Sequence, residues 1–147
     1  RDTHRRPVII GAAIGLLLAA AFLAGGLAVR NIPVIADPIT RVLEYTNHGS
    51  AWLIVVIALV NAVAEELFFR GALYTALGRF YPVVISTLLY AAATLATGNP
   101  MLAFAGLILG GVCGLQRRAT GGVLAPILTH VIWGPIMVLG LPPIFGL

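Results

Sequence analysis

The chain has 147 residues, of which 60% are hydrophobic and only 10% are charged, and its mean hydropathy is +1.03. Soluble domains carry about a quarter charged residues, so this composition excludes an ordinary soluble domain and indicates a membrane protein that the lipid bilayer partly covers. The net charge of +4 comes from nine arginines, and the sequence contains no lysine. These arginines are scattered between apolar runs, which argues against nucleic-acid binding.

Five apolar segments are predicted to be membrane-spanning helices, for which about 20 residues are needed. In chain order they are Pro7–Val29, Ala51–Phe69, Tyr81–Thr97, Met101–Leu115 and Gly121–Leu139, the fourth being the shortest. The stretch between the first two contains two prolines and is predicted to be a polar loop with a single surface turn of helix. The fold class is therefore all-α, a polytopic bundle in one domain over residues 1–147. The first residue is arginine, which is compatible with a fragment of a longer protein.

Arginine placement predicts the orientation, because cytoplasmic loops of membrane proteins carry an excess of basic residues. With a cytoplasmic N-terminus, the outer side holds only Arg30 and Arg41. The inner side then holds Arg1, Arg5, Arg6, Arg70, Arg79, Arg117 and Arg118. We therefore expect a multi-pass protein of a bacterial-type plasma membrane, with the N-terminus in the cytoplasm and the C-terminus outside.

Residues at helical spacing predict which faces point into the bundle. Small residues recur every four positions at Gly11, Gly15 and Ala19, and again at Gly106, Gly110 and Gly114. Such ridges let helices pack closely in lipid. Polar residues share one face of the third segment at Thr87, Tyr90, Thr94 and Thr97, which we expect to turn inward. In the fifth segment Pro126, His130 and Gly134 share a face, and Pro126 is expected to bend the helix.

Two of the five acidic residues, Glu65 and Glu66, stand side by side near the cytoplasmic end of the second segment. Glu66 precedes Arg70 by four residues, the favourable order for an ion pair on one helix. Glu65 is turned about 100° away, and its neighbours one turn distant are uncharged. Charged groups inside a membrane are costly and are functional candidates. Glu65 is therefore predicted either to accept a proton from water or to extend to the interface beside Arg79.

His130 is the only histidine inside a predicted segment, since His4 and His48 lie in polar flanks. A lone histidine on an apolar helix is often structural, but its cost in lipid favours a function. The sequence lacks the zinc-protease motif HExxH, the serine-hydrolase motif Gly-x-Ser-x-Gly, and any lysine for a serine–lysine pair. A glutamate and a histidine on different helices remain as candidate catalytic groups.

The stretch EELFFRG at 65–71 and the lead-in GGVLAPILTH at 121–130 resemble the CPBP intramembrane proteases. That family includes the CAAX prenyl endopeptidases and the bacteriocin-processing or self-immunity proteins of the Abi group. Its motifs are EExxxR, then FxxxH on a following segment and HxxxN on a later one, and the resemblance covers about residues 51–134. It implies that Glu65 activates a water molecule and that Glu66 with Arg70 orients it. It also implies that His130 contacts the water or the developing oxyanion.

Two positions depart from the family pattern. Tyr90 and Thr94 stand where FxxxH is expected, and Gly134 replaces the asparagine of HxxxN. Losing one oxyanion donor costs about 10² to 10³ in rate. The resemblance also allows a divalent metal such as zinc, held by Glu65 and His130. Catalytic zinc has about three protein ligands, so we expect no bound metal.

Three functions are weighed on this basis. The main hypothesis is an intramembrane endopeptidase that cuts a membrane-associated peptide or protein near the cytoplasmic face. The alternative is a catalytically weakened member that binds membrane partners, which Thr94 and Gly134 favour. A proton-coupled carrier is disfavoured, because the segments show no repeat of broken helices. Lipidated C-terminal cysteine peptides, a bacterial peptide and an anchored regulator all remain open as substrates.

Overall fold

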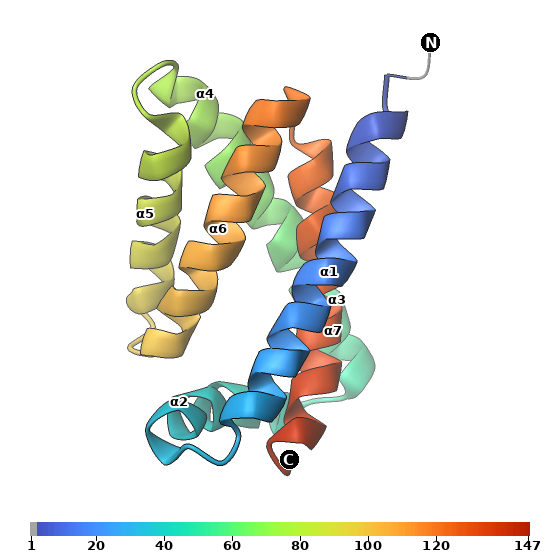
Figure 1. Cartoon of the computed structure of the whole chain (residues 1–147), viewed down its shortest axis with the longest axis vertical. Helices are drawn as coiled ribbons and strands as arrows, with labels where there is room; N and C mark the ends of the chain where they lie inside the picture. The colour runs from blue at the N-terminus through green and yellow to red at the C-terminus, as the bar shows by residue number, and fades with distance from the viewer. Residues whose placement is uncertain (1–2) are drawn as a thin grey trace.

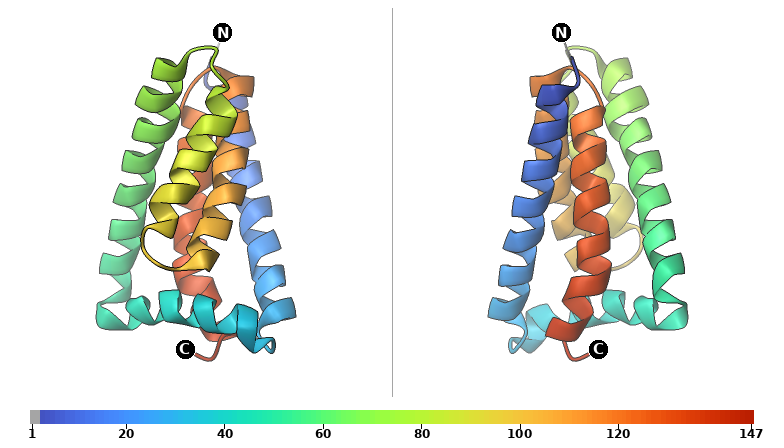
Figure 2. Two further views of the ribbon diagram at one scale, coloured as in Figure 1. Left: turned by 90° about the vertical axis from the view of Figure 1, so that its left-hand side faces the viewer. Right: turned by 90° about the vertical axis from the view of Figure 1, so that its right-hand side faces the viewer.

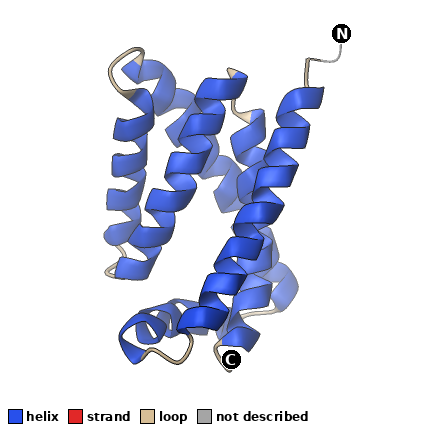
Figure 3. Cartoon of the chain, in the orientation of Figure 1, coloured by secondary structure: helices blue, strands red, loops and turns tan. Residues whose placement is uncertain are grey.

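The computed structural model describes residues 3–147, and this part of the chain is helical with short connections and no strand (Figure 1; Figure 3). Arg1, counted above with the cytoplasmic arginines, lies outside the described residues. Four described runs are long and apolar enough to cross a membrane: α1 (Arg5–Val29), Ala51–Leu77, α6 (Pro100–Thr120) and α7 (Leu124–Ile144). A shorter apolar helix, α5 (Pro82–Leu95), accompanies them. The prediction of an all-α membrane bundle with about five segments is confirmed.

The shortest segment is the third, whereas the sequence pointed to the fourth. α6 has 21 residues and extends beyond the predicted Met101–Leu115 at both ends. Its start is capped by the side chain of Asn99, and its end is set by Gly121, which adopts φ +76°. α5 has only 14 residues, or about 21 Å of helix, which is less than the roughly 30 Å hydrocarbon core.

The second span is longer than predicted and is not a uniform α-helix. α3 (Ala51–Glu66) continues through a π-helical segment, η2 (Leu67–Leu73), into the short α4 (Tyr74–Leu77). The two glutamates consequently lie near the middle of a run of 27 residues and not near its cytoplasmic end. The predicted end at Phe69 was wrong because Arg70 was taken as the polar boundary, whereas its side chain is completely buried.

The connection between the first two spans is helical, which corrects the predicted loop. α2 (Pro33–Leu43) and the 3-10 helix η1 (Glu44–His48) lie across one end of the bundle (Figure 2). Ala36 and Leu43 are buried, whereas the charged residues Asp37 and Arg41 are exposed, so α2 is amphipathic. Such a helix suits the membrane interface. Proline did not signal a loop here, because Pro33 occupies the first turn, where its missing N–H has no helical partner to lose.

Close helix packing follows the small-residue ridges. α1 packs along α7, α5 packs along α6, and α3 packs along a second side of α7 (Figure 1; Figure 2). The ridge residues are buried, and the glycines among them face the partner helix: Gly11, Gly15 and Ala19 on α1, and Gly106, Gly110 and Gly114 on α6. The predicted role of both ridges in packing is confirmed.

The variant Gly11→Ala is expected to lower the free energy of unfolding by about 1–3 kcal/mol, the usual cost of overpacking. A Cβ at Gly11 would lie 2.8 Å from the Ala125 carbonyl oxygen and 2.8 Å from Leu128 Cβ. Gly25 in the same helix has no atom within 4 Å of such a Cβ, so Gly25→Ala is a matched control and should gain helix propensity. Unfolding in detergent measures both variants, and equal stabilities would contradict this packing.

The polar face of α5 turns inward over only part of its length. Thr87 and Tyr90 are buried and Thr94 is half-buried, as predicted. Thr97 is exposed, because α5 ends at Leu95 and the chain turns away toward α6. The prediction for this last position was wrong.

The predicted inward face of α7 is confirmed, since Pro126, His130 and Gly134 are all buried. The predicted bend at Pro126 is not. α7 begins at Leu124 and not at Gly121, so Pro126 lies in the first turn, where a backbone N–H has no partner within the helix.

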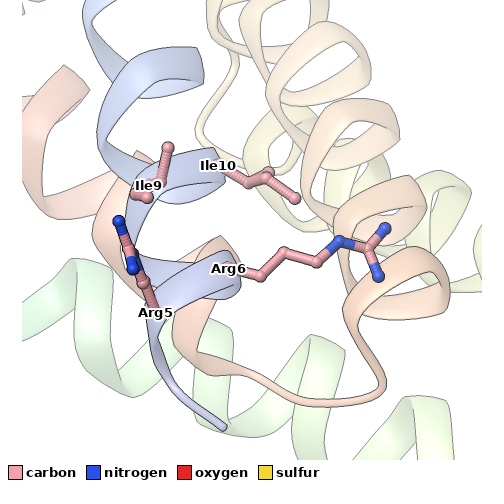
Figure 4. Close-up of a pocket in the computed structure, with 4 residues that line it drawn as sticks. All are labelled: Arg5, Arg6, Ile9 and Ile10. Carbon is pink, nitrogen blue, oxygen red and sulfur yellow. The ribbon is translucent and has the colours of Figure 1, made fainter. Parts of the chain in front are cut away.

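The surface of the bundle suits a bilayer. Large apolar side chains point outward along the spans, including Leu17, Trp52 and Leu88. The start of α1, where Arg5 and Arg6 lie one helical turn before Ile9 and Ile10 (Figure 4), is at the same end as α4 and the end of α6. α2 lies at the opposite end. The arginine-rich loops thus gather at one end of the bundle, whose cytoplasmic location stays a prediction.

Candidate active site

The centre of the site is a buried ion pair within one helical run. Arg70 Nη1 donates a hydrogen bond to Glu66 Oε1 at 3.0 Å, and both side chains have no exposed surface. The guanidinium lies 4.7 Å from the centre of the Tyr90 ring, a distance at which cation–π attraction operates. The backbone carbonyl of Arg70 accepts a hydrogen bond from Arg117 Nε at 2.9 Å. The predicted pair of Glu66 and Arg70 therefore forms, and it ties α3 to η2.

α7 brings His130 to both glutamates. His130 Nδ1 lies 2.8 Å from Glu66 Oε1, which is a hydrogen bond, and Nε2 lies 3.9 Å from Glu65 Oε2. Because an ionised carboxylate only accepts hydrogen bonds, a neutral imidazole here carries its proton on Nδ1 and leaves Nε2 as an acceptor. The sequence predicted that His130 shares a site with the glutamates but gave no sign that Glu66 holds its ring.

The two glutamates have different surroundings. Glu66 is buried and bound to Arg70 and His130, whereas the side chain of Glu65 is 38% exposed. Glu65 Oε2 accepts a hydrogen bond of 2.7 Å from the Tyr90 hydroxyl of α5. Glu65 can therefore reach a substrate or water, and Glu66 cannot without losing its partners.

The motif departures are visible in the same region. The Thr94 hydroxyl donates to the carbonyl of Ala91 in its own helix at 2.8 Å. It also fills the space against α6, where a Cβ on Gly106 would lie 2.8 Å from it. Gly134 is open, since among the described residues no atom beyond its chain neighbours and its own helix backbone lies within 4 Å of a Cβ placed there. Thr94 is thus engaged elsewhere, and Gly134 contributes only space.

An apolar cavity of about 810 Å³ lies beside these residues. Residues of α1, α2, α3, α6 and α7 line it, and nearly all are aliphatic or aromatic. Asn61, His130 and Gly134 line it on the side of the glutamates. Since α2 contributes to its wall, the cavity reaches the end of the bundle opposite the arginine-rich end, whereas the sequence placed the site near the arginine-rich end. Of the site residues Glu65, Glu66, Arg70 and His130, it is His130 that lines this cavity.

The donor set does not fit a metal ion. The described residues contain no group of three or more His, Cys, Asp or Glu side chains arranged to hold one. His130 Nδ1 and one oxygen of Glu66 are bound to each other, and one oxygen of Glu65 is bound to Tyr90. Only Glu65 and the Nε2 atom of His130 remain, fewer than the roughly three protein ligands of catalytic zinc. The chemistry below is therefore derived without a metal.

Comparison with known proteins identifies a family for the chain. The sequence profile of the family described as Type II CAAX prenyl endopeptidase Rce1-like matches residues 47–135, which is more than half of the chain. The chain belongs to this family. The matched range contains both glutamates, the arginine and the histidine of the site, and it identifies an integral membrane protein of CAAX protease type. No curated protein and no solved structure matches the chain.

The motifs did not indicate two features of this site. Tyr90 holds the more exposed glutamate through its hydroxyl, a contact for which phenylalanine at the same motif position has no group. Asn61 lines the cavity one helical turn before Glu65. In the sequence, Asn61 stands out as the polar interruption of the apolar run from Ala51 to Ala64.

Proposed function

We propose that the protein is an intramembrane endopeptidase in which Glu65 activates water to hydrolyse a peptide bond of a membrane-associated substrate. The observation that carries the proposal is the separation of 3.9 Å between Glu65 Oε2 and His130 Nε2 beside the cavity. This is too long for a direct hydrogen bond, and a single water molecule can bridge two polar groups at such a separation.

In the first step, the bridging water donates one hydrogen bond to Glu65 and the other to His130 Nε2. Glu65 removes a proton as the water oxygen forms a bond to the carbonyl carbon of the substrate. General-base assistance of this kind contributes about 10² to 10⁴ in rate. The Tyr90 hydroxyl fixes the carboxylate while the reaction proceeds.

In the second step, the protonated Glu65 returns its proton to the leaving nitrogen, and the C–N bond breaks. The products are a carboxylic acid, which ionises, and a free amine, so the proton count balances. Glu66 and Arg70 take no part in bond making. Glu66 accepts hydrogen bonds from Arg70 and His130 and thereby keeps the imidazole in place.

The proposed substrate carries an apolar group near the cleaved bond. The cavity has room for a large ligand and is lined almost wholly by apolar side chains, as is usual for sites that bind apolar ligands. A lipid-modified peptide, in line with the description of the family, and an apolar segment of a membrane peptide are the two classes that fit this wall.

The test is cleavage of a mixed library of membrane-anchored peptides by the full chain in liposomes made up in ¹⁸O-enriched water. We expect products whose new carboxyl end carries one ¹⁸O atom from the attacking water. The alternative function, binding of membrane partners without cleavage, draws on the engaged hydroxyl of Thr94 and the missing side chain at Gly134. Bound peptides that stay intact on folded protein would establish that alternative and overturn the endopeptidase.

A further inference from the structure

We propose that Asn61 donates the hydrogen bond that stabilises the oxyanion of the tetrahedral intermediate, at a place that Gly134 leaves without a side chain. This inference rests on the proposed hydrolysis. In the tautomer that Glu66 imposes, His130 Nε2 accepts a hydrogen bond and so holds the water. The negative charge that develops on the substrate oxygen therefore needs a donor from another residue.

Asn61 and Gly134 lie at the same level along two neighbouring helices, on the same side of the pair Glu65 and His130. α3 and α7 pack together and run in opposite directions (Figure 2), and Glu65 meets His130 across this contact. Asn61 precedes Glu65 by four residues, and Gly134 follows His130 by four. Since the helices are antiparallel, both positions lie about 6 Å from the catalytic pair in the same direction. Both line the cavity.

The amide of Asn61 is free to act. Its side chain is exposed where the cavity wall is otherwise almost entirely apolar. It makes no side-chain hydrogen bond to another described residue. Polar side chains inside membrane helices are costly and tend to be kept for a function. An NH₂ group offers N–H donors, and one of them aimed at the developing charge is the kind of group that stabilises an oxyanion.

The neighbouring donors are committed or enclosed. The Tyr90 hydroxyl donates to Glu65, and the Thr94 hydroxyl donates to the carbonyl of Ala91. Arg70 is completely buried behind α6, where a Cβ on Gly110 would lie 2.9 Å from its Nη2 atom. The indole nitrogen of Trp133 is fully enclosed as well. Among the polar groups at this end of the cavity, the Asn61 amide is the donor that a substrate can reach.

The first experiment measures cleavage of a library peptide by the native chain, Asn61→Ala, and Asn61→Ala combined with Gly134→Asn. We expect Asn61→Ala to lower kcat about 10²-fold, the cost of one oxyanion donor, with KM unchanged. Gly134→Asn should restore most of this loss, because there is room for the new side chain. Asn47→Ala, which removes an exposed asparagine from η1, is the matched control and should keep native activity.

A second measurement separates this inference from the proposed activity. Membrane-anchored phosphinate peptides imitate the tetrahedral intermediate, and their binding is measured without turnover. Binding to the native chain that weakens about 10²-fold in Asn61→Ala, while the parent peptides bind equally, supports the inference even if the native chain cleaves nothing. Phosphinate binding that does not depend on Asn61 overturns it, as does full activity of folded Asn61→Ala.

Discussion

The variant Glu65→Gln is expected to lose cleavage activity by about 10² to 10⁴, the contribution of a positioned general base. Glutamine has the size and shape of glutamate and keeps an oxygen that can accept the hydrogen bond from Tyr90. It cannot accept a proton from water near neutral pH. Because Glu65 is 38% exposed and makes no ion pair with an arginine of residues 3–147, the substitution should leave membrane insertion and folding unchanged.

The measurement compares cleavage of the same anchored peptide by both chains in liposomes, with the free energy of unfolding determined in parallel. Glu44→Gln is the matched control, since it removes the same charge from an exposed position in η1. It should cleave at the native rate. If Glu65→Gln cleaved as fast as the native chain, Glu65 would not be the base, and the proposed mechanism would have to be abandoned.

Much of the bundle could be predicted because lipid imposes simple rules on sequence. Apolar length located the helical runs, and glycine spacing located the close contacts that Gly11 and Gly110 make. The ion pair of Glu66 and Arg70 followed from a spacing of four residues on one helix. Each of these inferences needs only the sequence of one helix. Its apolar length, the spacing of its glycines and the spacing of its charged residues can all be read without knowing the other helices.

The predictions that were wrong or missing concern contacts between residues that are far apart in the sequence. A buried, paired Arg70 extends the second span to Leu77, and no local pattern distinguishes it from an arginine at the interface. Ala36 and Leu43 of α2 are buried at the end of the bundle, where this helix contacts α6 and α7. The bonds from Tyr90 to Glu65 and from Glu66 to His130 join residues 25 and 64 positions apart. The fold has to bring these groups together before their roles can be inferred.

The structure changes how the departures at Thr94 and Gly134 bear on activity. A missing histidine at Thr94 removes a group from α5, but Tyr90 of the same helix binds Glu65 directly. A missing asparagine at Gly134 leaves space on α7, and Asn61 of α3 faces that level of the cavity. The departures therefore do not by themselves indicate an inactive protein, because Tyr90 offers a hydrogen-bond donor on the same helix and Asn61 offers an amide on a neighbouring one.

The second large effect is expected from Glu66→Gln, which should lower the free energy of unfolding by about 3–5 kcal/mol, as when one partner of a buried ion pair is removed. Arg70 has no exposed surface, and its Nε and Nη2 atoms have no hydrogen-bond partner in the part of the chain that the structure describes. Its charge would then lie in the bundle without compensation. His130 would also lose the carboxylate that fixes its ring.

Reversible unfolding in detergent or bicelles measures this loss, and Glu66→Gln combined with Arg70→Gln tests its cause. If the cost arises from the uncompensated guanidinium, the double variant should be more stable than Glu66→Gln alone, because the charge is removed with its partner. Turnover that disappears from Glu66→Gln at native stability would instead place Glu66 among the groups that act on the water. The two glutamates are thus separated by opposite signatures: lost turnover with intact folding for Glu65, and lost folding free energy for Glu66.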